Sequence, residues 1–68
     1  MTSTSDRAEL STLRAQVQDL LERITPLAER YGDSPDSVIA SDLFAGERAL
    51  LSARRALDQA ISHLEDDA

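Results

Sequence analysis

The strongest constraint in this chain of 68 residues is the regular spacing of apolar side chains in its first half. Seven apolar residues follow one another at alternating steps of three and four, which places them along one face of an α-helix. They are Leu10, Leu13, Val17, Leu20, Ile24, Leu27 and Tyr31. The spacing therefore predicts a long amphipathic helix.

The second half of the chain carries a matching series in which large and small residues alternate. Its members are Ile39, Leu43, Gly46, Leu50, Ala53, Leu57, Ala60 and Leu64. Gly, Asp, Ser and Pro at 32–35 separate the two series, and such a cluster is typical of a turn. Because a short turn brings consecutive helices together antiparallel, the sequence predicts an all-α fold, an antiparallel two-helix hairpin. Within it, the large residues of the first helix are expected to pack into the large-small groove of the second.

The predicted boundaries give one domain with short tails. They are a disordered N-terminal tail at 1–5, a helical hairpin at 6–64 with helices at about 7–31 and 35–64 joined by a turn at 32–34, and an acidic C-terminal tail at 65–68.

Local signals set these boundaries. Asp6 with Glu9 has the arrangement of a capping box at the first helix. Pro26 is predicted to kink this helix without ending it, although a stop before Pro26 is the alternative. Gly32 is predicted to end it in the left-handed conformation. The second helix is predicted to begin at Ser34-Pro35-Asp36, with Ser41-Asp42 as the alternative start.

The composition of the chain disfavours several classes of function. Thirteen acidic residues against seven basic ones give a net charge of −6, which disfavours direct binding to nucleic acid or anionic lipid. The chain has no cysteine, so neither a disulfide nor a thiolate-held metal is expected. The sequence contains neither a signal-peptide pattern nor an apolar run of the roughly 20 residues that span a bilayer, so a cytoplasmic location is expected. All basic residues are arginine and alanine is abundant, which favours a bacterial source of high GC content.

A hairpin of this size buries a small core, so association with another chain is expected to complete it. We therefore predict a homodimer that forms a four-helix bundle. Apolar residues beside the predicted hairpin seam, which include Ala28, are expected to stay exposed. The predicted interface consists of Leu21, Phe44, Leu51 and Ile61. In the first helix, β-branched residues alternate with leucine, which leaves a parallel two-stranded coiled coil as an alternative.

The sequence predicts no catalytic, cofactor-binding or metal-binding residues. His63 is the single histidine and has only nearby acidic residues to accompany it, whereas a metal site needs several ligands on a rigid frame. Arg48, Arg54 and Arg55 form the main basic cluster and are expected to be solvated. The predicted function is a non-catalytic protein–protein interaction module that self-associates or docks on a larger protein. The alternative is a small acidic regulatory or inhibitory protein, of the antitoxin or anti-factor type, that masks a basic surface of its partner.

Overall fold

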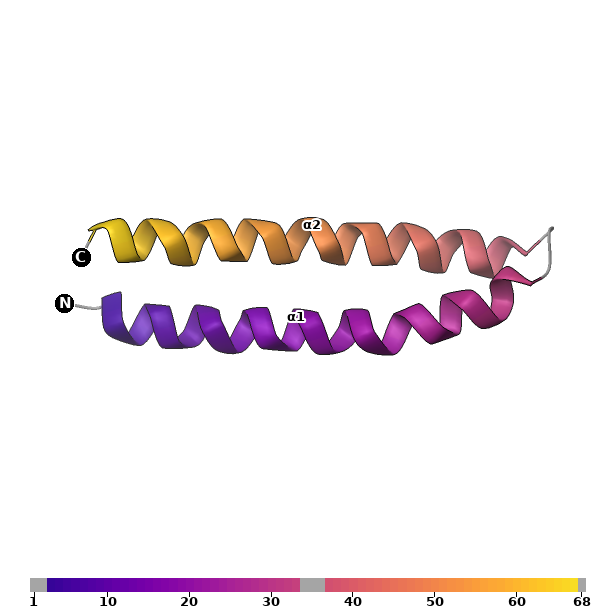
Figure 1. Cartoon of the computed structure of the whole chain (residues 1–68), viewed down its shortest axis with the longest axis horizontal. Coiled ribbons are helices and arrows are strands. Elements are labelled where there is room, and N and C mark those ends of the chain that lie inside the picture. The colour runs from indigo at the N-terminus through magenta and orange to yellow at the C-terminus, as the bar shows by residue number, and fades with distance from the viewer. Residues whose placement is uncertain (1–2, 34–36, 68) are drawn as a thin grey trace.

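The computed structural model describes residues 3–33 and 37–67. This part of the chain holds two helices, α1 over Ser3–Gly32 and α2 over Val38–Asp67. The helices lie side by side and antiparallel, with the start of α1 and the end of α2 at the same end of the rod (Figure 1). Its backbone extends over 52 × 15 × 11 Å. The predicted all-α helical hairpin is therefore confirmed. Neither α1 nor α2, over the residues described, is long and apolar enough to cross a membrane.

The first helix begins earlier than its capping signal predicts. Ser3, Thr4 and Ser5, which are predicted to lie in a disordered tail, belong to α1, and residues 1–2 lie outside the described residues. Asp6 therefore lies in the first turn instead of at the N-cap, and the predicted capping box is wrong. Its carboxylate still favours the helix, because the N-terminal end of a helix dipole attracts negative charge.

Pro26 lies inside α1, and the helix continues through it as predicted. The proline ring removes the amide hydrogen that would bond to the carbonyl of Glu22. One residue earlier, the hydroxyl of Thr25 lies 3.0 Å from the carbonyl oxygen of Leu21, a contact that favours bending. Beyond this region the helix slants toward α2 (Figure 1). The predicted kink is therefore present, and the alternative stop before Pro26 is wrong.

The end of α1 is packed against α2. Gly32 is the last residue of α1, and no glycine among the described residues has a positive φ, so the predicted left-handed stop is wrong. A Cβ built on Gly32 would lie 3.6 Å from Cζ of Phe44. The ring of Phe44 thus covers the C-terminal end of α1, at a distance that would be ordinary van der Waals contact for a Cβ at this position.

Ser37, which lies outside the predicted start signals, caps the start of α2. The amide nitrogen of Ala40 donates a hydrogen bond of 3.0 Å to Oγ of Ser37, the geometry of an N-cap. The predicted start at 34–36 lies outside the described residues, and the alternative at Ser41-Asp42 is wrong because both residues lie inside α2. The helix continues to Asp67, so the residues at 65–67 that were predicted to form a tail are helical, and residue 68 lies outside the described residues.

The interior of the hairpin is small and lies to one side of the predicted stripe. The buried hydrophobic residues of the described chain are Leu21, Ala28 and Ala40. Leu21 is 5% exposed, whereas the adjacent Leu20 is 44% exposed. The predicted seam is therefore wrong at Leu20, and the expected exposure of Leu21 and Ala28 is wrong as well. Because Ala28 and Ala40 are small, they allow the two backbones to approach closely in this orientation.

Candidate functional site

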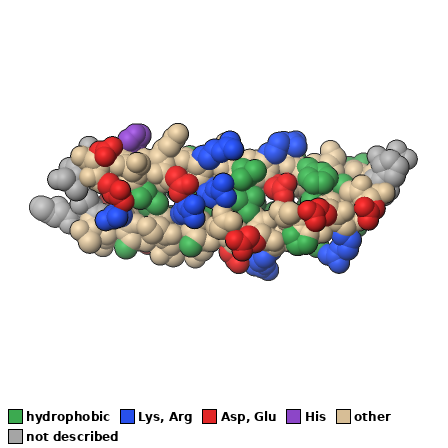
Figure 2. Space-filling view, viewed as in Figure 1, with side chains coloured by type: hydrophobic (Ala, Val, Ile, Leu, Met, Phe, Trp, Pro, Cys, Tyr) green, Lys and Arg blue, Asp and Glu red, His purple; other side chains and the backbone are tan. Residues whose placement is uncertain are grey.

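Four hydrogen bonds join the two helices along one long side of the hairpin, which we call the polar side. They join Arg7 Nη2 to Glu65 Oε1 at 2.7 Å, Arg14 Nε to Asp58 Oδ1 at 2.8 Å, Arg54 Nη1 to Gln18 Oε1 at 2.7 Å, and Thr25 Oγ1 to Glu47 Oε2 at 2.5 Å. Acidic and basic side chains accordingly line the boundary between the helices (Figure 2). This long side of the hairpin is therefore closed by polar contacts within the chain.

The same four hydrogen bonds fix one register over the whole hairpin. Seven residues forward on α1, from Arg7 to Arg14, correspond to seven residues back on α2, from Glu65 to Asp58. The other two pairs obey the same rule, because each step forward on α1 is matched by an equal step back on α2. They are Gln18 with Arg54 and Thr25 with Glu47. The level of any residue of α1 relative to α2 therefore follows from its number.

Among the described residues, the opposite long side, which we call the apolar side, carries no charged pair between the helices. Helical spacing of 3.6 residues per turn places eight residues there, across each helix from the polar pairs. From α1 they are Leu13, Leu20, Leu27 and Tyr31, and from α2 they are Ile39, Gly46, Ala53 and Ala60. All four α1 residues and Ile39 are exposed large hydrophobic side chains. Exposed apolar side chains that gather on one side of a small protein, instead of being scattered singly, are typical of interaction surfaces.

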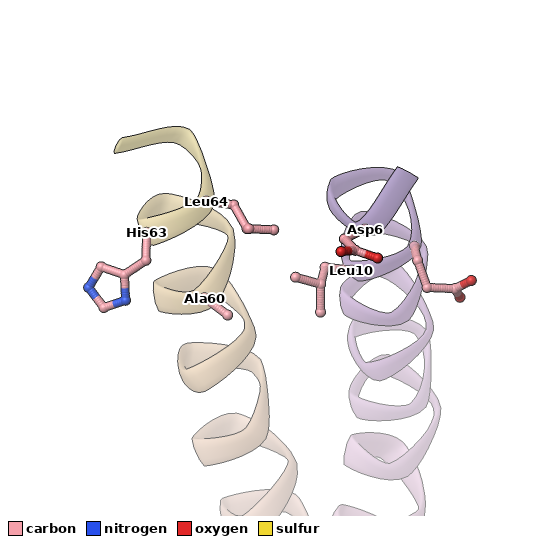
Figure 3. A pocket seen from close by; sticks show the side chains of 6 residues that line it. Asp6, Leu10, Ala60, His63 and Leu64 are labelled. Atoms are coloured by element: carbon pink, nitrogen blue, oxygen red, sulfur yellow. The ribbon is translucent and has the colours of Figure 1, made fainter. Parts of the chain in front are cut away.

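A groove opens on the apolar side between the first turns of α1 and the last turns of α2 (Figure 3). Its volume is about 520 Å³, and the residues that line it are Asp6, Glu9, Leu10, Ala60, His63 and Leu64. Leu10 and Leu64 point toward each other across the groove, whereas His63 points away from α1 (Figure 3). Within the described ranges, no three histidine or carboxylate side chains are grouped so that they could hold a metal ion. The groove is thus an apolar surface with a polar rim.

The interface residues predicted from the sequence do not form one exposed patch. Leu21 is buried between the helices, and Ile61 is half-buried. Leu51 is half-buried and lies beside Leu21 in a groove of the polar side. Phe44 is 36% exposed and packs over Gly32. No observation tests whether these residues contact a partner, so their role as an interface stays a prediction.

The periodicity of the sequence places the exposed leucines of the apolar side in the hairpin interior, and the structure shows that this prediction is wrong. The signal that identifies their exposure is the polar spacing: Arg7 and Arg14 lie seven residues apart, as do Asp58 and Glu65. Two such series of opposite charge indicate the edge along which two helices meet. Arg54, from the predicted basic cluster, belongs to the same edge, whereas Arg48 and Arg55 are exposed.

No protein-family model, curated protein or solved structure matches this chain. The candidate site is accordingly defined by the geometry of the hairpin.

Proposed function

We propose that this chain is a non-catalytic protein–protein interaction module that docks through its apolar side, either on another copy of itself or on a larger protein. The observation that carries the proposal is the run of Leu13, Leu20 and Leu27, which stays exposed on a helix whose next residues, Arg14, Leu21 and Ala28, face α2. A cytoplasmic location, expected from the sequence, is part of the proposal.

The exposed leucines support docking because their burial is the main stabilisation that the hairpin leaves unused. Each fully buried leucine contributes about 2 kcal/mol relative to an exposed one. Leu20, the most exposed of the three, lies near the middle of the rod, where a partner surface would exclude water most completely. The polar side lacks this property, because its charged side chains already bond to each other.

A pair of matched variants tests this proposal. Leu20→Arg introduces a charge on the apolar side, and Leu51→Arg introduces the same charge on the polar side. We expect sedimentation velocity over a concentration series to show assembly of the natural chain and of Leu51→Arg, but not of Leu20→Arg, with equal helicity by circular dichroism. A parallel pull-down from the native cell covers a larger partner. Equal assembly and equal capture by all three chains would contradict the proposal, and selective loss in Leu51→Arg would favour the interface predicted from the sequence.

One observation favours a second candidate function, a small acidic regulator that masks a basic surface. Arg7, Arg14, Arg23 and Arg54 each bond to side chains of the same chain. Three of these contacts pair an arginine with a carboxylate and leave the net charge of −6 unchanged, so the outward surface stays acidic. Binding of this type weakens steeply as salt rises. Binding through the apolar side is expected to change little between low and high salt, which separates the two functions.

A further inference from the structure

The hairpin exposes more surface than a folded monomer of its mass. Its accessible area is 5020 Å², whereas a globular monomer of 7.4 kDa is expected to expose about 4,200 Å². The difference of about 800 Å² is the area that each partner contributes to a standard protein–protein interface. The area therefore matches one further interface along the hairpin.

The apolar series of α1, from Leu10 to Tyr31, points partly toward α2 and partly toward the apolar side. Leu10, Val17 and Ile24 are half-buried, whereas the residues that alternate with them, such as Leu13 and Leu20, are exposed. In a four-helix bundle each helix has two neighbours, and its apolar stripe points between them toward the bundle axis. In this hairpin α2 partly covers one set of these residues, and a second neighbouring helix would cover the set that is exposed.

The register places a large residue beside a small one at three levels of the apolar side. Counting from the hydrogen-bonded pairs, Leu13 is level with Ala60 to within one residue. By the same count, Leu20 is level with Ala53, and Leu27 is level with Gly46. At each of these levels a large side chain projects from α1, whereas the residue of α2 beside it is small and leaves a depression in the surface.

We propose that the apolar side is covered by a second copy of this chain, related to the first by a two-fold axis that runs parallel to the helices. This inference rests on the proposed function and names its partner. Rotation about such an axis exchanges α1 and α2 across the interface and keeps every residue at its level. Leu27 of one copy then lies over the partner's Gly46, and Leu20 lies over the partner's Ala53. All neighbouring helices in the resulting four-helix bundle are antiparallel.

Gly46 fits this arrangement because the hairpin itself gives no reason for a glycine there. The residue lies in the interior of α2, where glycine destabilises a helix relative to alanine. No side chain or neighbouring helix lies within 4 Å of a Cβ built on it. A partner leucine over Gly46 would use the space that the missing side chain leaves.

Charged side chains on the apolar side and at its rim also match under this rotation. Arg30, on the outer rim of α1, is level with Asp42 of α2 by the same count, and both are exposed. At the other end, Glu9 is level with His63, whose imidazole has an N–H donor for a carboxylate. The rotation brings each group opposite its complement in the other copy. A two-fold axis perpendicular to the helices would instead place α1 against α1, with leucine against leucine.

Disulfide trapping tests the arrangement, because the natural chain has no cysteine. Gln16 and Ala56 are exposed rim residues at the same level, on α1 and α2. Gln16→Cys and Ala56→Cys chains are prepared separately, mixed and oxidised mildly. We expect the mixed disulfide to dominate over both homodimeric products. Dominance of the Gln16→Cys homodimer would overturn the parallel two-fold axis in favour of contact between the two α1 helices. Absence of any disulfide dimer would overturn the proposal that a second copy covers the apolar side.

A volume change at Gly46 provides the second test. Gly46→Leu is expected to abolish the dimer in sedimentation velocity while the helicity of the chain stays at or above that of the natural protein. Gly46→Ala is the matched control, with a smaller loss of dimer. A Gly46→Leu chain that dimerises like the natural one would overturn the inference. If the natural chain is a monomer at every concentration while Leu20→Arg alone loses capture of a larger protein, this inference fails and the proposed function stands.

Discussion

The two long sides of the hairpin differ in the kind of contact that the helices make along them. On the polar side, arginine, glutamine and threonine bond to side chains of the other helix, so both partners of each bond belong to one chain. On the apolar side, leucine and tyrosine of α1 lie beside small residues of α2 and stay exposed. Polar contacts set the orientation of the helices, and apolar area provides the larger part of the stabilisation. The difference teaches that contacts within one chain set the register of this hairpin, whereas a large part of its apolar surface stays exposed.

The largest expected effect separates two adjacent leucines. Leu21→Ala removes a buried side chain and is expected to lower the free energy of unfolding by about 2–3 kcal/mol. Leu20→Ala removes an exposed one and is expected to change the stability of the dilute single chain by about 0.5 kcal/mol or less. Urea denaturation followed by circular dichroism at low protein concentration measures both. Equal losses for the two variants would show that the seam is not oriented toward Leu21.

The helix glycines provide the next comparison. Gly46→Ala is expected to stabilise the dilute single chain by about 1 kcal/mol, because alanine is the better helix former and the added methyl meets nothing. Gly32→Ala is expected to give a smaller gain, since Gly32 ends α1 and its new methyl contacts the ring of Phe44. Thermal melting at low concentration checks both shifts. A lower melting temperature for Gly46→Ala would show that the hairpin itself needs the glycine.

The N-cap of α2 lies outside both sides and serves as a reference for them. Ser37→Ala removes the hydroxyl that accepts the amide hydrogen of Ala40, and is expected to cost about 1 kcal/mol. Ser37→Asp keeps an acceptor and is expected to restore most of this stability. Neither change should alter the solution mass, which separates loss of helix stability from loss of an interface.

The smallest effect belongs to the polar side. A double-mutant cycle with Arg14→Ala and Asp58→Ala is expected to give a coupling free energy of about 0.2–1 kcal/mol, typical of exposed ion pairs. The coupling should fall toward zero in high salt, because dissolved ions screen exposed charges. A coupling that persists in high salt would indicate that the pair is shielded from solvent. The apolar side is expected to show the opposite behaviour, with association that is retained in salt.

Much of the fold follows from local patterns that the sequence shows directly. The break at 32–35 and the two apolar series predict two helices, and both α1 and α2 are present. Asp19 and Arg23 have the four-residue spacing of an ion pair along a helix, and the pair is present at 3.6 Å. The ends of the helices are predicted less well, because capping residues are common in the chain and neighbouring packing decides among them.

The candidate site follows less directly. The predicted interface at Leu21 and Leu51 assumes that the centre of the stripe faces α2, whereas the structure turns its edge toward α2. Periodicity shows that Leu20 and Leu21 lie on a broad apolar face, but it does not show which of them meets the neighbour. Arg54 illustrates the same limit: Asp58, four residues away, is a possible local partner, and the observed one is Gln18 on the other helix.

By itself, the sequence determined that this chain forms two long amphipathic helices joined by a short turn, because helix formation depends on residues three and four positions apart. The tertiary structure decided the rotation of each helix about its own axis. That rotation depends on contacts between residues far apart in the chain, such as Arg14 with Asp58, and on the close approach that Ala28 and Ala40 permit. Those long-range contacts buried Leu21 and left Leu20 exposed.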